Sequence, residues 1–174
     1  MTKKEFLNAV SNGKIDILQV FLDTISAIGA GYCVIGGLAV NAYADPVVSL
    51  DLDIIIATED IEKVCEVASE HFKIQRFAHS INLSSTESDL RIQLQTDSRY
   101  QDFISRATYH NVLGYEMKVA DVKDVFKGKI WAYSDTERRM SKRQKDLADI
   151  LRLIESFPNL MEQLPDTIRD KIEL

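Results

Sequence analysis

Only two cysteines and three histidines occur among the 174 residues of this sequence, which leaves little material for soft-metal or redox chemistry. Cys33 and Cys65 lie in apolar segments outside any CxxC pair or Cys/His cluster, so we expect reduced core thiols rather than a disulfide or a zinc site. The histidines, His71, His79 and His110, are too scattered to predict a metal centre or a catalytic triad. The candidate chemistry therefore depends on other residue types.

Proline is also rare, with only Pro46, Pro158 and Pro165, and the chain has no internal repeat or low-complexity segment. No linker is therefore expected before the end of the chain. The hydrophobic content of 45% is enough for one domain with a core. We predict a single domain over residues 1–174, with a sheet-containing core over 1–120 and a helical part over 121–174.

Long apolar runs are absent as well. The first residues contain none of signal-peptide length, and no later stretch approaches the roughly 20 residues of a membrane span. We therefore expect a cytoplasmic protein without membrane contact. Basic residues are not in excess, because 21 Lys and Arg stand against 27 Asp and Glu, for a formal net charge of -6. This balance argues against nucleic-acid binding over the whole surface, but it is compatible with a local basic cleft.

Hydrophobic periodicity predicts alternating helices and strands in the first half of the chain. In chain order, the expected elements are a helix over residues 15–28, a strand over 32–35, a helical turn before Pro46, a strand over 50–56 and a helix over 61–72. Gly29 and Gly31 stop the first helix, Gly36-Gly37 breaks the first strand, and Thr58 caps the last helix.

A second β region follows, in which IQRFAHSINLS and DLRIQLQT alternate with period two. This pattern predicts antiparallel neighbours joined at SSTES. The alternation in the second segment gives two faces, with Leu90, Ile92 and Leu94 on one and Arg91, Gln93 and Gln95 on the other.

The last third of the chain is predicted to be mainly helical. A short strand pair is expected around residues 111–119, helices over 121–133 and 141–157, and a weak helix after Pro165. The whole pattern predicts an α/β (α+β) fold, in which a mixed sheet is flanked by helices and followed by a helical part.

The segment YCVIGGLAVNAYADPVVSLDLDIII contains the residues most suited to chemistry. Gly36-Gly37 at the end of a strand would let the backbone approach a phosphate closely. Asp51 and Asp53 are two apart on a strand, so their side chains leave the same face, with Cα atoms roughly 6 to 7 Å apart. Two such carboxylates can share divalent cations, which phosphoryl and nucleotidyl transfer require.

A simpler interpretation of both motifs is that Gly-Gly is only a turn and that Asp-Leu-Asp is only the polar side of an edge strand. The flanking residues disfavour it, because Leu50, Leu52 and the run Ile54-Ile55-Ile56 predict a buried strand. Unpaired aspartates are costly in such a strand, so buried paired acids favour a bound cation.

With its Gly-Gly pair, thirteen intervening residues and Asp-Leu-Asp in an apolar strand, the chain resembles the nucleotidyltransferase-fold superfamily. The rest resembles the branch related to the AbiEii toxins of bacterial type IV toxin–antitoxin systems. That branch carries a lysine-bearing helix and an R-x-K-D-x-x-D segment, which here are Lys129 and RQKDLAD from Arg143 to Asp149. The likeness covers most of residues 32–154 and implies a nucleotidyltransferase-type sheet.

The resemblance also implies roles for individual residues. It implies that Gly36 and Gly37 form the nucleotide-phosphate loop and that Asp51 and Asp53 are catalytic ligands of Mg²⁺. Further catalytic positions, expected to hold or activate nucleotide and acceptor, are Lys129, Lys145, Asp146 and Asp149. Arg143 and Gln93 are expected to contact the nucleotide.

The chain departs from the family pattern at two points. The basic residue often found before the acidic strand is replaced by Val47 and Val48. The third carboxylate of the family falls at Gln93, whose amide oxygen can ligate a metal but brings no charge, so turnover comes into question. Asp89 and Asp97 share the strand parity of Gln93 and are candidates to substitute for it.

The helical residues also have structural interpretations. Lys129 lies on the apolar stripe of its helix, where it either extends its amine to water or points at a phosphate. Lys142, Lys145, Asp146 and Asp149 form one stripe, which periodicity alone would describe as a solvated face. The basic cluster that adds Arg138, Arg139 and Arg143 to these lysines would suit RNA phosphate or an acidic partner.

Two functions from different classes remain at this stage. The first is a Mg²⁺-dependent enzyme that transfers a nucleoside monophosphate from an NTP to a hydroxyl of tRNA, other RNA or protein. The second is a catalytically weak or inactive nucleotide- or RNA-binding module that acts through a partner protein, and Gln93 supports it. A toxin neutralised by an antitoxin protein is a biological role compatible with either.

Overall fold

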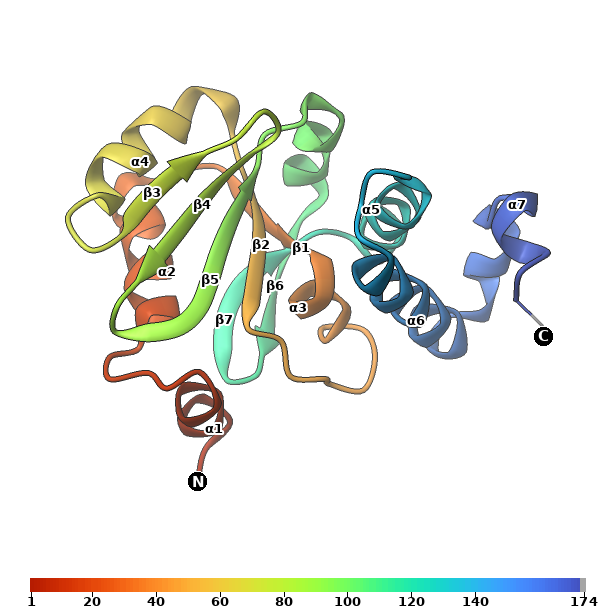
Figure 1. The fold of residues 1–174 in the computed structure, drawn as a ribbon, viewed down its shortest axis with the longest axis horizontal. Coiled ribbons are helices and arrows are strands. Elements are labelled where there is room, and N and C mark those ends of the chain that lie inside the picture. The colour runs from red at the N-terminus through yellow and green to blue at the C-terminus, as the bar shows by residue number, and fades with distance from the viewer. Residues whose placement is uncertain (173–174) are drawn as a thin grey trace.

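The computed structural model describes residues 1–172 and contains one seven-stranded mixed sheet with helices on both sides (Figure 1). The strands are, in chain order, β1 (Tyr32–Ile35), β2 (Asp51–Ile56), β3 (Lys73–Arg76), β4 (Ser80–Ser85), β5 (Ser88–Gln95), β6 (Thr108–Val112) and β7 (Tyr115–Val119). Their order across the sheet is β3-β4-β5-β2-β1-β7-β6. The chain therefore places β2, with its Asp-Leu-Asp, at the centre of the sheet.

Helices cover the sheet and extend beyond it. The helices are α1 (Lys3–Val10), α2 (Ile17–Ile28), α3 (Gly36–Val40), α4 (Ile61–Ala68), α5 (Val122–Ser134), α6 (Met140–Ser156) and α7 (Asp166–Arg169), with 3-10 turns η1 (Thr58–Asp60), η2 (Ser98–Arg106) and η3 (Pro158–Gln163). Helices α2 and α4 contact each other on one side of the sheet, whereas α3 contacts β1 and β2 and also α5 and α6 (Figure 1). Helix α3 thus joins the sheet to the helical part.

Two strand pairings place the acidic segment. Strand β2 is antiparallel to β1 and parallel to β5. Leu52 and the run Ile54-Ile55-Ile56 are fully buried, as predicted for a buried strand, while Asp51 and Asp53 are partly exposed on the face that Ile55 shares. Strand β5 shows the same alternation, and its antiparallel pairing with β4 confirms the predicted hairpin.

Several predicted boundaries need correction. The first amphipathic helix begins at Ile17 because the Asp16 carboxylate accepts a hydrogen bond from the Gln19 amide and caps it. The helix predicted after Gly36-Gly37 begins at these glycines. Thr58 caps no helix: it begins η1, and α4 follows Asp60, whose carboxylate accepts a hydrogen bond from the Gly31 amide instead. The sequence pattern also missed α1 and η2.

The two cysteines lie in the core as free thiols, as expected. Burial raises the pKa of the Cys33 thiol to about 12, which keeps it protonated and unreactive. Within residues 1–172, no helix combines the length and apolar character needed to cross a membrane.

Candidate active site

Asp53 sits at the meeting point of three strands. Ile35 of β1 is its antiparallel register partner, and Gln93 of β5 is its parallel partner. Asp51, two residues earlier on the same face, pairs in register with Arg91. The sheet therefore aligns an aspartate with a glutamine in one row and an aspartate with an arginine in the next.

Gly36 fits this position because it has no side chain. Its φ of +71° is left-handed, and a Cβ added to it would lie only 2.9 Å from the Cβ of Asp53 and even closer to its carboxylate. A Cβ on the neighbouring Gly37 would lie 3.8 Å from the Ser49 Oγ and 3.9 Å from an Asp149 oxygen, which are ordinary contacts. The two glycines of the motif are thus unequal, and Gly36 is the one that the Asp53 site requires.

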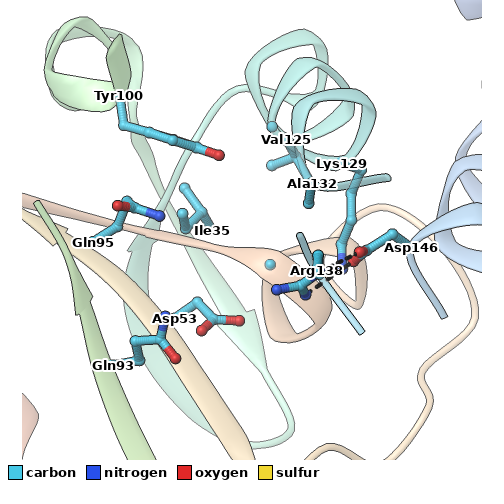
Figure 2. Close-up of a pocket in the computed structure, with 12 residues that line it drawn as sticks. Ile35, Asp53, Gln93, Gln95, Tyr100, Val125, Lys129, Ala132, Arg138 and Asp146 are labelled. Atoms are coloured by element: carbon cyan, nitrogen blue, oxygen red, sulfur yellow. Dashed lines mark hydrogen bonds and ion pairs between the residues drawn. The ribbon is translucent and has the colours of Figure 1, made fainter. Parts of the chain in front are cut away.

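A pocket of about 70 Å³ opens over Asp53 (Figure 2). Its lining comes from the sheet, the first residue of α3, η2, both long helices and the turn between them: Ile35, Gly36, Asp53, Gln93, Gln95, Tyr100, Val125, Gly128, Lys129, Ala132, Arg138 and Asp146. The Tyr100 hydroxyl points into it, and burial raises the pKa of Tyr100 to about 12, so that this hydroxyl stays protonated. We call this cavity the Asp53 pocket.

The Asp53 carboxylate has no partner of its own. Among residues 1–172 no hydrogen bond or ion pair joins it to another group, although it lines the pocket. Burial raises its pKa, the charge of Lys129 lowers it, and nearby Asp51 raises it further. This carboxylate faces the pocket without a protein partner, so its oxygens are available to a cation.

Asp51, by contrast, is engaged by two basic side chains. The Arg91 Nε lies 2.8 Å from Asp51 Oδ1, and the Lys142 Nζ of α6 lies 3.4 Å from Oδ2. Lys142 thereby links the helical part to the acidic strand. The two aspartates share a face, but one is neutralised by side chains and the other is not.

Lys129 lies at the centre of a buried ion-pair network. Its Nζ is 3.0 Å from Asp146 Oδ1, and Arg138 contacts the other Asp146 oxygen at 2.7 Å (Figure 2). The Lys129 Nζ is also 2.8 Å from Asp149 Oδ2. Lys129 is 8% exposed and Asp146 1%, so the alternative in which the lysine extends to water is wrong. Burial lowers the pKa of Lys129, but the carboxylates of Asp149 and Asp146 more than offset this, and its pKa is raised overall.

A second, larger pocket of about 410 Å³ lies on the other side of Gly37 and Asp51. Its lining consists of Gly37, Val47, Val48, Ser49, Leu50, Asp51, Arg91, Lys145, Ala148, Asp149 and Arg152. We call it the Asp51 pocket. Lys145 is exposed here, and no hydrogen bond or ion pair engages its amine within residues 1–172. Arg152 is paired with Asp149 at 2.7 Å.

The structure thus brings most of the predicted site residues to two adjoining pockets. Gly36, Asp53, Gln93, Lys129 and Asp146 line the first, whereas Gly37, Asp51, Lys145 and Asp149 line the second.

The buried Asp146 shows that the polar stripe of α6 is not simply a solvated face. Arg143 lines neither pocket, because its Nε donates to the Tyr133 carbonyl at 2.7 Å and its guanidinium lies over the Tyr133 ring.

Sequence patterns missed Arg91, Tyr100 and Arg152 as site residues. The parity of β5 contained the signal for Arg91, because it faces the same way as Gln93. Tyr100 lies in η2, where the sequence predicts no helix or strand, and its ring packs against that of Trp131 with the centroids 5.0 Å apart.

The oxygen donors present suit a hard divalent cation such as Mg²⁺. Asp53 offers an unpaired carboxylate, and Gln93 beside it offers an amide oxygen. Asp51 would contribute only if it gave up a contact to Arg91 or Lys142. Within the described residues no group of three His, Cys, Asp or Glu side chains is placed to hold a metal, so a third carboxylate is missing. Asp89 is hydrogen-bonded to Asn12 and Asp97 to Arg99, and neither lines the Asp53 pocket.

No family model matches the sequence, and no curated relative was detected. Solved structures nevertheless share the fold. ANT(2")-Ia, in complex with adenylyl-2"-tobramycin, is 13% identical with a TM-score of 0.64, over 89% of this chain and 96% of that one. The lincosamide antibiotic adenylyltransferase LnuA, lincomycin-bound, is 12% identical with a TM-score of 0.57, over 81% and 98%.

An antigenic nucleotidyltransferase-like protein from Paracoccidioides brasiliensis is 18% identical with a TM-score of 0.51, over 99% of this chain and 96% of that one. The fold of this chain is therefore of the nucleotidyltransferase type, as the Gly-Gly and Asp-Leu-Asp motifs predict. At such identities the likeness concerns the fold alone.

Proposed function

We propose that this protein is a Mg²⁺-dependent nucleotidyltransferase, which transfers a nucleoside monophosphate from an NTP to a hydroxyl group. The observation that carries the proposal is the unpaired Asp53 carboxylate in a pocket that also contains two cationic side chains. An ionised carboxylate that faces a pocket and has no protein partner keeps its oxygens available as ligands for a divalent cation.

The position of each residue suggests its role. Asp53, with Gln93 beside it, would hold the cation, and Asp51 flanks this position. Lys129 and Arg138 lie on the pocket wall, where the phosphates of an NTP would lie, and both are paired with Asp146, which lines the same wall. Gly36 and Gly37 leave room for the triphosphate against the backbone. When bound, Mg²⁺ would neutralise the triphosphate and stabilise charge that develops on it.

The acceptor is assigned to the Asp51 pocket. Its volume of about 410 Å³ falls in the range of ligand sites, and it adjoins the aspartates. Exposed Lys145 there suits an anionic acceptor, which favours RNA, including tRNA, over an uncharged hydroxyl compound. The Arg-x-Lys-Asp-x-x-Asp segment is the basis for assigning the chain to the AbiEii-like branch, with a toxin role and an antitoxin protein as partner. Transfer to a protein hydroxyl is the other acceptor chemistry of this proposal.

The second candidate is a nucleotide-binding module with little or no turnover. Two observations favour it: a neutral Gln93 stands beside Asp53, and Asp51 is neutralised by Arg91 and Lys142. Both reduce the negative charge available to hold metal ions.

One experiment separates the two candidates. The protein is incubated with each α-labelled NTP, with Mg²⁺ or with chelator, in the presence of total RNA or a protein extract, and label in the acceptor is measured. The proposal expects Mg²⁺-dependent label that Asp53→Asn abolishes and Arg76→Gln leaves intact, since Arg76 pairs with exposed Glu62 on the opposite side of the sheet. Metal-dependent NTP binding without label in any acceptor would support the binding module, and transfer that survives Asp53→Asn would refute the assigned site.

A further inference from the structure

The contacts of Asp51 bear on how many metal ions the site can bind. Two carboxylates on one strand face can share two divalent cations, and each cation then needs further oxygen ligands. In this chain the Arg91 guanidinium contacts one Asp51 oxygen at 2.8 Å, and the Lys142 ammonium lies 3.4 Å from the other. Both oxygens of one shared ligand are therefore turned toward fixed positive charges.

The position of Arg91 follows from the sheet register. Strands β2 and β5 are parallel, with Asp51 opposite Arg91 and Asp53 opposite Gln93. Residues 91 and 93 face the same way, so the strand beside the two aspartates presents a cation and a neutral amide. A guanidinium is a permanent charge that cannot be removed by titration. It also points its N–H groups at the oxygens a metal would use.

We propose that Arg91 takes the place of a second divalent cation, so that the site binds a single one, at Asp53. This inference rests on the proposed function, because it assumes that Asp53 binds a metal together with an NTP. Two features exclude the second cation. Arg91 and Lys142 neutralise Asp51, so this carboxylate no longer attracts a second cation. Gln93 is neutral, so it adds no negative charge to offset the repulsion between two cations.

The two features make separate contributions. The Arg91 side chain is 65% exposed, so its ion pair is screened by water and could open. Replacing Gln93 by a carboxylate alone should therefore give a second cation a weak site. Removing Arg91 as well should strengthen that site, because one fixed positive charge beside it is lost.

The test is a count of bound metal ions. Mn²⁺ bound per chain is measured by electron paramagnetic resonance of the free ion and by calorimetry, with a non-hydrolysable NTP analogue present throughout. The proteins are the wild type, Arg91→Gln, Gln93→Asp and the double variant, with Arg76→Gln as a control that breaks an exposed arginine–glutamate pair elsewhere. Thermal unfolding verifies that each is folded.

We expect one Mn²⁺ in the wild type, Arg91→Gln and Arg76→Gln, and two in the double variant. The second Mn²⁺ should bind about tenfold more tightly to the double variant than to Gln93→Asp alone. Two ions in the wild type, or equal second-site affinity in Gln93→Asp and the double variant, would overturn the inference while leaving the proposed function intact. No bound Mn²⁺ in the folded wild type would overturn both. If the double variant fails to fold, the wild-type count still tests the single-cation site: one Mn²⁺ supports it, and two overturn the inference.

Discussion

Gln93 lies directly opposite Asp53 on the neighbouring parallel strand, so a neutral amide stands beside the one unpaired carboxylate of the Asp53 pocket. The same register sets Arg91 beside Asp51. A one-residue shift of β5 would turn both side chains into the core and bring Leu90 and Ile92 to this face. The electrostatics of the candidate site are thus a direct consequence of strand register.

Asp53→Asn should stabilise the protein in the absence of metal. Burial raises the pKa of Asp53, so its ionisation costs folding free energy. Because the pKa of this acid is raised in the folded state, its ionisation lowers the free energy of unfolding as the pH rises. Below the unfolded pKa of about 3.9, both states bind the proton and there is no cost, and stability is lost as the pH rises through the folded pKa.

The measurement is urea unfolding of wild type and Asp53→Asn in chelator, from pH 3 to 8. We expect the variant to be more stable at pH 7 by about 0.5–2 kcal/mol, with the difference vanishing near pH 3. A variant that is less stable than the wild type at pH 7 would show that Asp53 has a favourable partner and would remove the main support for the cation site.

Gly36→Ala should lower both the free energy of unfolding and the affinity for metal. Gly37→Ala is the matched control. An alanine at residue 36 must adopt a left-handed conformation, which costs about 1–2 kcal/mol, and its Cβ would press on the Asp53 side chain. The Cβ at residue 37 meets only ordinary contacts.

Unfolding free energy and Mn²⁺ affinity are measured for both variants. We expect a clear loss of both for Gly36→Ala and changes within about 0.5 kcal/mol for Gly37→Ala. Equal effects of the two substitutions would contradict the role assigned to Gly36.

Lys129→Met tests the buried network. The substitution leaves Asp146 and Asp149 without the ammonium between them, and breaking a buried pair costs about 3–5 kcal/mol. Arg138 and Arg152 still contact these carboxylates, so we expect the free energy of unfolding to fall by about 3 kcal/mol, the lower end of that range.

Lys63→Met is the control, because Lys63 pairs with Glu66 at an exposed position. This substitution should lower the free energy of unfolding by less than about 1 kcal/mol. Denaturant unfolding measures both variants. A cost for Lys129→Met as small as that of the control would show that the three charges are solvated rather than buried.

The sequence predicts the parts of this site that depend on one element at a time. Strand parity predicts that Asp51 and Asp53 share a face, and helix periodicity predicts that Lys129 points inward. The ion pairs could not be predicted, because Arg91 reaches Asp51 through a strand pairing and Lys142 reaches it from α6.

Arg143, predicted to contact the nucleotide, lines neither pocket for a local reason. It lies one residue from Lys142 on α6, which rotates its side chain away from the stripe of Lys145 and Asp149 and toward Tyr133. Tyr100 escaped prediction because the 3-10 turn that carries it lacks the periodicity of an α-helix.

Gln93→Asp should make the stability of the protein depend on metal. Without metal, the new carboxylate lies opposite the unpaired Asp53 in a partly buried row, and the like charges repel. With metal, the new carboxylate at residue 93 is a second charged ligand for the cation at Asp53. The variant should therefore be less stable than the wild type in chelator, and it should gain more on addition of Mg²⁺.

The gain is set by mass action, since a ligand at 100 times its dissociation constant stabilises the folded state by about 2.7 kcal/mol. If Gln93→Asp tightens binding about tenfold, its melting temperature should rise more steeply with Mg²⁺ concentration than that of the wild type. Ser84→Asp is the control, because Ser84 is exposed on neighbouring β4, outside both pockets. Melting curves of the three proteins over a Mg²⁺ series decide the question. Parallel responses of wild type and Gln93→Asp would place residue 93 outside the metal's reach and remove it from the candidate site.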